Sequence, residues 1–288
     1  MLYYQTANIK FMKNYFLFVL LFSTYLSYSQ DIEFSNCSGN LLYINPAFTG
    51  TSRNLRIGVS GAAEYRLKKN KYFATNIYAD QYLGKNNGIG ISYLYEGYYK
   101  WTKETFHINY AYQVPVGKIN VLSIGLKGGF VKSDYIHGSN IEADGGIGLL
   151  FYNKRIFASY GVSHLTRTIF IKEVYGTAPN HNVFFGGNLN IGNIKISPQI
   201  ELNLGSWNSS GLALMKIGYK WFSLGAAFRT DESYYGMFGV KIKNVNLNYS
   251  YDFSEPKSSP YIINTHEFSV QLLLNTLKNE NERAINIL

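Results

Sequence analysis

The stretch VNLNYSYDF, Val245–Phe253, alternates without a break between apolar and polar side chains. One parity is Val, Leu, Tyr, Tyr and Phe, and the other is Asn, Asn, Ser and Asp. Successive side chains of a β-strand point to opposite faces, so the stretch predicts a strand with one apolar and one polar face. The question it raises is whether the apolar face meets a protein core or a lipid bilayer.

The same alternation recurs along most of the chain. Thr105–Val114 (TFHINYAYQV) and Ile194–Leu204 (IKISPQIELNL) repeat it, although Pro198 would remove a ladder hydrogen bond from a paired strand. Segments of roughly 9–14 residues suit tilted strands that cross a membrane, and soluble strands are about half as long. We count about fourteen segments, which begin near Arg53, Tyr72, Gly88, Lys103, Ile119, Glu142, Arg155, Asn180, Ile194, Ser209, Trp221, Tyr234, Asn244 and Asn264.

The connections between these segments fall into two classes. Connections after even-numbered segments are tight: GKNN, PVGK, NK, GN, YK and KN. Connections after odd-numbered segments are longer: LKKNK, EGYYKWT, SDYIHGSN, HLTRTIFIKEVYGTAP, LGSWNS, TDESY and SEPKSSPYII. Outer-membrane barrels have short periplasmic turns and long extracellular loops, whereas a secreted β-sandwich has no reason to collect its long loops at one end.

The sequence therefore predicts an all-β protein, a transmembrane antiparallel β-barrel of about 14 strands in the outer membrane of a Gram-negative bacterium. A closed barrel satisfies every backbone hydrogen bond inside hydrocarbon, so the apolar parity faces lipid and the polar parity lines the lumen. The alternative is a sandwich that buries the apolar parity in a core. The polar parity gives these lumen-facing candidates: Glu96, His107, Gln113, Lys195, Gln199 and Glu201.

The ends of the chain predict further segments. Lys13, the apolar run Phe16–Phe22 and the small residues Ser27–Ser29 have the order of a secretory signal peptide. We assign residues 1–29 to that peptide, with Met12 as the expected true start. We expect a periplasmic segment or plug at 30–52, the barrel at 53–275 and a periplasmic tail at 276–288.

Composition narrows the function classes. Aromatic residues make up 17% of the chain and 27 Gly stand against 6 Pro, a balance that favours strands. The net charge of +9 is spread along the chain without a nucleic-acid motif, and the one cysteine, Cys37, forms no internal disulfide. Ser163 and His164 are neighbours, so in a regular strand they point to opposite faces and form no catalytic pair. We expect no enzyme activity, no metal, no cofactor and no nucleic-acid partner.

One irregular stretch, Leu41–Gly50 (LLYINPAFTG), precedes the first strand and contains the turn signal Asn45-Pro46. With Gln30-Asp31, Phe34-Ser35 and the later Tyr65-Arg66, it resembles the PorP/SprF family of outer-membrane proteins in the type IX secretion and gliding systems of Bacteroidetes. Asp144–Leu165 is similar to the central hairpin of that family, and Thr265–Val270 to its last strand. The family motif falls on Asn45, Pro46, Ala47, Phe48, Gly50, Tyr65 and Arg66.

The resemblance implies a non-enzymatic partner of the secretion machinery that exports or retains cell-surface proteins such as large adhesins. Some positions depart from the family pattern: Leu67-Lys68 replaces a glutamine-tryptophan pair, Asn36–Asn40 replaces a more apolar stretch, and Leu277–Leu288 extends past the last strand. These departures bear on which secreted protein is the partner.

The expected width of the barrel bears on whether a folded protein could pass through it. A folded domain of about 100 residues is more than ~25 Å across, and about fourteen strands enclose less room than the 16–18 strands of a porin. We therefore expect an anchor or adaptor whose N-terminal segment contacts periplasmic secretion components. The alternative is a passive channel for a small or hydrophobic solute. The leading partner-facing candidates lie in the loop Thr166–Pro179, where apolar residues are expected on the surface: Ile169, Phe170, Ile171 and Val174.

Overall fold

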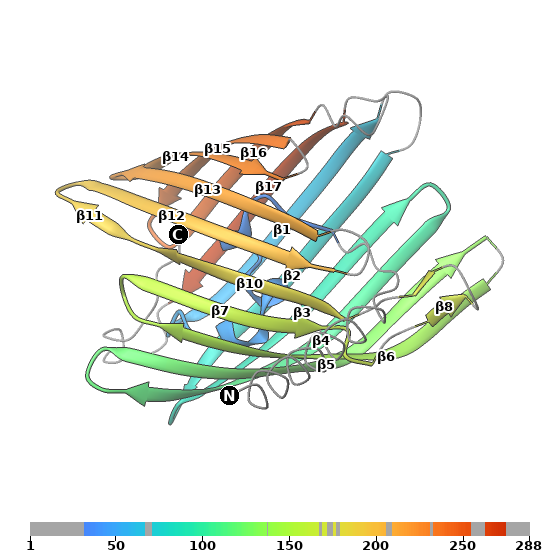
Figure 1. The fold of residues 1–288 in the computed structure, drawn as a ribbon, viewed down its shortest axis with the longest axis horizontal. Coiled ribbons are helices and arrows are strands. Elements are labelled where there is room, and N and C mark those ends of the chain that lie inside the picture. The colour runs from blue at the N-terminus through green and yellow to red at the C-terminus, as the bar shows by residue number, and fades with distance from the viewer. Residues whose placement is uncertain are drawn as a thin grey trace, which may run out of the picture.

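The computed structural model describes residues 32–66, 71–136, 138–166, 169–171, 175–176, 179–205, 209–230, 233–254 and 263–274. In these residues fourteen antiparallel strands close into a barrel, as the sequence predicted (Figure 1). The wall consists of β1 (Leu55–Arg66), β2 (Lys71–Gly84), β3 (Asn87–Tyr98), β4 (Trp101–Val116), β5 (Asn120–Tyr135), β6 (Gly138–Tyr152), β7 (Ile156–Ser163), β10 (Asn180–Gly187), β12 (Ile194–Leu204), β13 (Ser209–Tyr219), β14 (Phe222–Arg229), β15 (Ser233–Ile242), β16 (Val245–Ser254) and β17 (Ile263–Leu274).

The barrel closes where its first and last strands meet. β1 pairs with β17 over its whole length, from Leu55 opposite Leu274 to Arg66 opposite Ile263. Every wall strand thus has a neighbour on both sides, so the lipid-facing wall has no open edge of the kind that hydrocarbon would penalise. The described residues contain no helix with the length and hydropathy of a membrane span.

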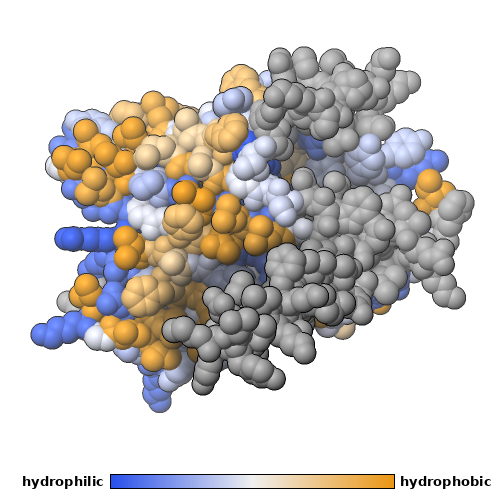
Figure 2. All heavy atoms as spheres, in the orientation of Figure 1, coloured by the Kyte–Doolittle hydropathy of each residue, from blue (hydrophilic) through white to orange (hydrophobic). Residues whose placement is uncertain are grey.

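Exposure along β16 answers the question raised by its sequence. Tyr249 and Phe253 are 41% and 58% exposed, whereas Ser250 and Asp252 are 2% and 6% exposed. The apolar parity points outward and the polar parity inward, the reverse of a soluble protein. Figure 2 shows hydrophobic residues spread over the outer surface, where a bilayer would contact them. The lipid-facing orientation of the apolar parity is confirmed.

Pro198 lies in β12 at a place where the ladder is interrupted. The short strand β11 (Leu189–Ile191) continues β10 after a break at Asn188, and β12 pairs with both pieces. Asn188 lies beside the residue before the proline, since Ser197 Oγ donates to Asn188 Oδ1 at 2.8 Å. Proline cannot donate a ladder hydrogen bond, and its position at the break avoids that loss.

Two connections differ from the sequence prediction. EGYYKWT and SDYIHGSN were expected to be long loops, but β3 and β4 are separated only by residues 99–100, and β5 and β6 only by 136–137. The strands continue through these stretches because cross-strand partners are available, as in the pair Tyr98 and Trp101. Figure 1 shows β5 and β6 extending past the ends of β7 and β10. The longest connection, residues 164–179, remains a loop and contains the small sheet β8 (Ile169–Ile171) and β9 (Tyr175–Gly176).

Candidate functional site

The segment that precedes the barrel wall lies inside the barrel. It contains the short helices η1 (Cys37–Gly39), α2 (Leu41–Ile44) and η2 (Pro46–Phe48). Every residue from Phe34 to Arg53 is buried except Tyr43, which is half-buried. We call Phe34–Arg53 the lumen segment. Because it is buried, the expectation that this part of the chain contacts periplasmic secretion components is not supported for these residues.

Asn45 and Pro46 fix the end of the lumen segment that lies nearest the short turns. Asn45 is the N-cap of η2, since its side chain accepts a hydrogen bond from Ala47 N at 2.8 Å, and Pro46 occupies the first helical position. The Asn45 amide also donates to the carbonyl of Leu149 on β6 at 3.3 Å. This asparagine therefore forms the turn and attaches it to the wall.

Phe48 anchors the same turn by apolar contact. Its ring is fully buried and packs against Phe157 of β7 and Phe184 of β10, both at 6.1 Å between centroids. Ser123 of β5 donates to the Ala47 carbonyl at 2.7 Å. The Asn-Pro-Ala-Phe sequence thus contacts strands from a wide arc of the wall.

Asp80 of β2 holds the residues that follow the turn. Its carboxylate accepts from Gly50 N at 2.6 Å and from Arg56 Nε and Nη2 at 2.7 and 2.9 Å. Arg56 Nη2 also donates to the Phe48 carbonyl at 3.0 Å. Gly50 has φ +72°, and a Cβ there would lie 2.9 Å from Gly88 Cα, so this position requires glycine. One buried ion pair within the wall therefore holds the segment through hydrogen bonds to Gly50 and Phe48.

Wall glycines let the segment approach the strands closely. A Cβ on Gly125 of β5 would overlap the backbone of Pro46 and Ala47, and a Cβ on Gly148 of β6 would overlap the Asn45 side chain. A Cβ on Gly88 of β3 would lie 2.5 Å from the Thr49 carbonyl oxygen. These strands combine lumen-facing glycine with the irregular backbone of the segment, as expected where two backbones meet.

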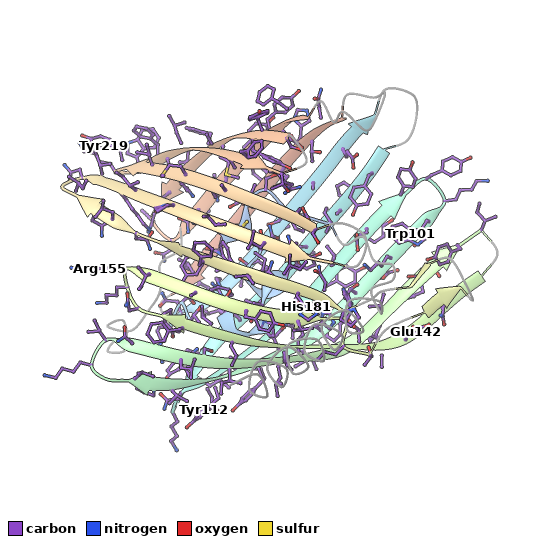
Figure 3. The ribbon with its side chains drawn as sticks, in the orientation of Figure 1. Trp101, Tyr112, Glu142, Arg155, His181 and Tyr219 are labelled. Atoms are coloured by element: carbon purple, nitrogen blue, oxygen red, sulfur yellow. The ribbon has the colours of Figure 1, made fainter. Side chains whose placement is uncertain are left out.

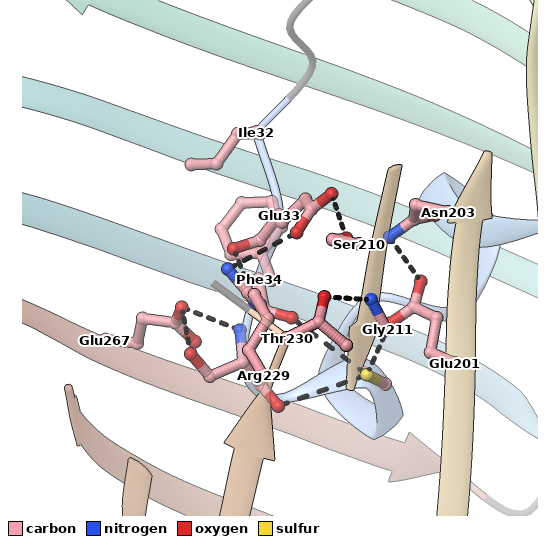
Figure 4. A network of polar contacts seen from close by, with 12 residues as sticks. Ile32, Glu33, Phe34, Glu201, Asn203, Ser210, Gly211, Arg229, Thr230 and Glu267 are labelled. Atoms are coloured by element: carbon pink, nitrogen blue, oxygen red, sulfur yellow. Dashed lines mark hydrogen bonds and ion pairs between the residues drawn. The ribbon is translucent and has the colours of Figure 1, made fainter. Parts of the chain in front are cut away.

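The other end of the lumen segment is held by carboxylates. Glu267 of β17, labelled in Figure 4, accepts from Ser35 N at 2.7 Å and from Asn36 N at 3.2 Å. Glu33 lies 3.4 Å from Arg229 of β14. Polar wall groups therefore hold both ends of the segment.

Cys37 contributes a buried thiol to this contact. Its sulfur donates to Glu201 of β12 at 2.8 Å, and burial raises the pKa of the Cys37 thiol well above its usual value. The thiol is accordingly protonated and acts as a donor. Glu201 also accepts from Asn182 of β10 at 2.7 Å.

Three of the six lumen-facing candidates contact the lumen segment, and a fourth, Glu96, pairs with wall residues. Gln113 donates to the Thr49 carbonyl at 3.0 Å, and Gln199 lies within hydrogen-bond distance of Ser38. Glu201 accepts from Cys37, as described above. Glu96 lies 3.2 Å from Lys103 and accepts from Tyr72 at 2.7 Å.

The other two candidates lie apart from the segment contacts. His107 Nε2 is 2.9 Å from Asp144 Oδ2, and the same oxygen lies 3.0 Å from His164 Nδ1. His164 has φ +57°, an uncommon conformation for a non-glycine residue, and it begins the longest connection. Asp144 thus links the lumen wall to the base of that loop. Lys195 lies on the lumen side of β12 near the short-turn end and is half-buried.

Several remaining candidates are only partly described. Tyr65 and Arg66 end β1, where Tyr65 pairs with Asn264, and their side chains are outside the described part of the structure. Ile169, Phe170 and Ile171 form the strand β8, and only their backbone is described. Val174 lies outside the described residues, and so do the expected signal peptide 1–29 and the expected tail 276–288.

A cavity of about 50 Å³ remains between the segment and the wall on the long-loop side. Ligand pockets typically measure roughly 300–1,000 Å³, so this space suits a few water molecules. Its lining includes Ile32, Phe34 and Tyr43 from the segment side and Lys103, His107 and Asn182 from the wall.

Sequence reasoning missed the residues that bind the segment most directly. Asp80, Glu267 and Arg229 stand on polar parities, so alternation places them in the lumen, but their partners are far away in the chain. Asp144 was missed for the same reason. Alternation predicts the direction of a side chain and carries no information about its partner.

Comparison with known proteins assigns the family. The sequence matches the family described as type IX secretion system membrane protein PorP/SprF over residues 26–272. The chain belongs to the PorP/SprF family. It is an outer-membrane protein of the type IX secretion system, and the family is one of secretion membrane proteins and not of enzymes. No curated protein matches this PorP/SprF chain.

Solved structures share the fold at low identity. The Ralstonia pickettii toluene transporter TbuX has a TM-score of 0.58 at 9% identity, covering 81% of this chain and 93% of its own. The CymD monoaromatic hydrocarbon channel has a TM-score of 0.56 at 9% identity, covering 84% and 94%. The Acinetobacter baumannii outer membrane protein Omp33 has a TM-score of 0.50 at 10% identity, covering 77% and 100%. At such identities the likeness extends to the fold alone.

Proposed function

We propose that this PorP/SprF barrel is an anchor or adaptor for the export or surface retention of a secreted protein such as a large adhesin. The observation that carries the proposal is the buried lumen segment, which hydrogen-bonds to the wall at both ends. A lumen filled in this way offers no path for a folded domain, which is more than ~25 Å across. The passenger is held outside, and other components of the system provide its route.

The passenger-facing surface is the loop that follows β7. Its base is tied to the extended hairpin β5–β6, because Leu165 N donates to the Gly145 carbonyl at 3.0 Å and Thr166 Oγ1 to the Ala143 carbonyl at 2.7 Å. His164 fixes the first residue of the loop through Asp144. A loop that starts from a rigid base can present its apolar residues to a partner at a small entropic cost.

Affinity capture tests this function. The tagged barrel is purified from detergent-solubilised outer membrane with and without crosslinking, and the bound proteins are identified by mass spectrometry. Recovery of one large surface protein together with secretion components is the expected result. A barrel that comes alone even after crosslinking contradicts the adaptor function.

Deletion of the loop tests the surface. Removing residues 166–179 should abolish surface display of the passenger, while the barrel still inserts and resists heat on a gel. Removing residues 255–260, which belong to another long connection, serves as the matched control and should leave display intact. Normal display after the first deletion would exclude the loop as the passenger contact.

A second candidate is a passive channel for a small or hydrophobic solute. It is favoured by the fold shared with a toluene transporter and a monoaromatic hydrocarbon channel. Liposome swelling separates the two functions. Swelling at a porin-like rate with the parent protein would favour the channel, and no swelling would favour the adaptor.

A further inference from the structure

The short turns of the barrel are basic. Five of the six short connections carry lysine, and one of them adds arginine. We call these exposed residues the basic rim: Lys85, Lys118, Lys154, Arg155, Lys220 and Lys243. In Figure 3, Arg155 projects from the end of the barrel that carries the short turns, opposite the end near Trp101 and Glu142. The rim concentrates positive charge at one end of the molecule.

Acidic residues are absent from the rim. No aspartate or glutamate lies within three positions of any of the six short turns, all of which are described. Glu64 and Asp252 lie instead near the strand ends that lead into long connections, and Glu96 lies near the same end of β3. No acidic neighbour in these turns therefore neutralises the rim cations, which remain available to an anionic ligand.

The backbone is left-handed at three of the rim lysines. Lys85, Lys220 and Lys243 adopt φ values of +49°, +53° and +52°, a region that favours glycine. The turn that lacks lysine has Gly192 with φ +58°. Three lysines therefore occupy positions where glycine would fit the backbone better, so glycine can replace them without strain.

Large apolar residues beside the cations indicate how deep the basic rim lies in the membrane. Ile119 and Trp221 are turn residues with 67% and 59% exposure, and Leu83 and Ile242 immediately precede turns and are similarly exposed. Figure 2 shows hydrophilic groups projecting between hydrophobic ones at the left edge, the short-turn end in Figure 1. Adjacent apolar and cationic residues are typical of the boundary between acyl chains and headgroups.

We propose that the basic rim binds the phosphate headgroups of anionic glycerophospholipids in the leaflet that faces the periplasm. The lysine and arginine side chains contact the phosphates, and the neighbouring apolar residues contact the upper acyl chains. The apolar residues favour a lipid surface over an acidic protein, since a protein that bound only the charges would leave them in water. The inference concerns the membrane environment of the barrel and does not depend on its passenger.

Quenching of Trp221 by brominated lipids tests the proposal. The full-length barrel with Trp101→Phe and Trp207→Phe, in which Trp221 is the only tryptophan, is reconstituted in phosphatidylcholine vesicles. Brominated phosphatidylglycerol or brominated phosphatidylcholine is added at equal fractions. We expect phosphatidylglycerol to bind beside Trp221 roughly fivefold more strongly at low salt. At 1 M salt the preference should disappear, because the Debye length falls to about 3 Å.

Replacing Lys85, Lys220 and Lys243 by glycine removes charge without straining the turns. This variant should fold as the parent does and lose most of the lipid preference. The matched control, Lys68→Gly, Lys69→Gly and Lys100→Gly, removes equal charge from the long-connection end and should keep the preference. Equal quenching by both lipids in the parent, or an unchanged preference in the rim variant, would overturn the proposal. Equal quenching in the parent would leave an acidic periplasmic protein as the alternative ligand of the rim.

Discussion

Asp80 is the buried acceptor at which the wall and the end of the lumen segment meet. Its carboxylate neutralises the buried Arg56 and accepts from Gly50 N, so three buried donors have one acceptor. The side chains of the pair are 0% and 4% exposed. Because water cannot replace either partner, removal of the carboxylate leaves a buried charge without compensation.

Asp80→Ala should therefore destabilise the barrel by about 3–5 kcal/mol. The free energy of unfolding is measured by urea titration in lipid vesicles, followed by tryptophan fluorescence. Asp80→Leu combined with Arg56→Met removes both charges and should lose much less than the single variant. A single variant as stable as the parent would contradict the role of this ion pair.

Tyr249 tests the outward face of the wall. It lies in the middle of β16 and is 41% exposed to the lipid side. Tyr249→Arg should cost ~2–4 kcal/mol, because it places a charge at the hydrocarbon centre. Phe253→Arg lies near the strand end and should cost about 0–1 kcal/mol. Heat resistance of the folded band on a gel ranks the two variants, and equal losses would argue against the membrane depth assigned to β16.

At the level of elements, two wall glycines differ in what lies above them. A Cβ on Gly148 of β6 would overlap Asn45, whereas Gly128 of β5 has open space at the Cβ position. Gly148→Ala should displace the turn of the lumen segment at a cost of about 1–3 kcal/mol, and Gly128→Ala should be nearly neutral. Protease cleavage near Asn45 in the folded barrel measures the displacement. Equal protection of the two variants would exclude close packing of the segment at Gly148.

The strands could be predicted from the sequence because their pattern is local. Lipid on one side and polar groups on the other require alternating side chains. The ends of β4, β12 and β16 could therefore be predicted to within a few residues. The turn at residues 99–100 was misjudged, because Glu96, Gly97 and Lys100 have the composition of a loop. There cross-strand pairing outweighs composition.

The lumen segment could not be placed from the sequence. Leu41–Gly50 has no periodicity, and its location depends on contacts with residues such as Asp80, Gly125 and Gly148 that stand far apart in the chain. A plug in the lumen and a segment in the periplasm were both compatible with its turn signal. The close approach of Gly125 and Gly148 is visible only once the strands are folded around the segment.

The barrel wall has an outer and an inner surface with different surroundings. Its outer face is apolar and meets lipid, and its inner face is polar and binds the lumen segment in place of water. The segment is held at one end by Asp80 and at the other by Arg229 and Glu267. Because these contacts are ionic and hydrogen-bonded, side-chain substitutions can weaken them while the barrel wall keeps its closed ladder.

The combined variant Asp80→Ala and Arg229→Ala should open a path for ions. In planar bilayers we expect no steady conductance from the parent and stepwise conductance from the variant, since one side chain that holds the segment is removed at each end. The conductance should stay below that of porins, because fourteen strands enclose less room than 16–18. Surface display of the passenger should not rise, since a folded domain more than ~25 Å across cannot use this lumen. Porin-like conductance from the parent would contradict a closed lumen, and increased display in the variant would identify the barrel itself as the conduit.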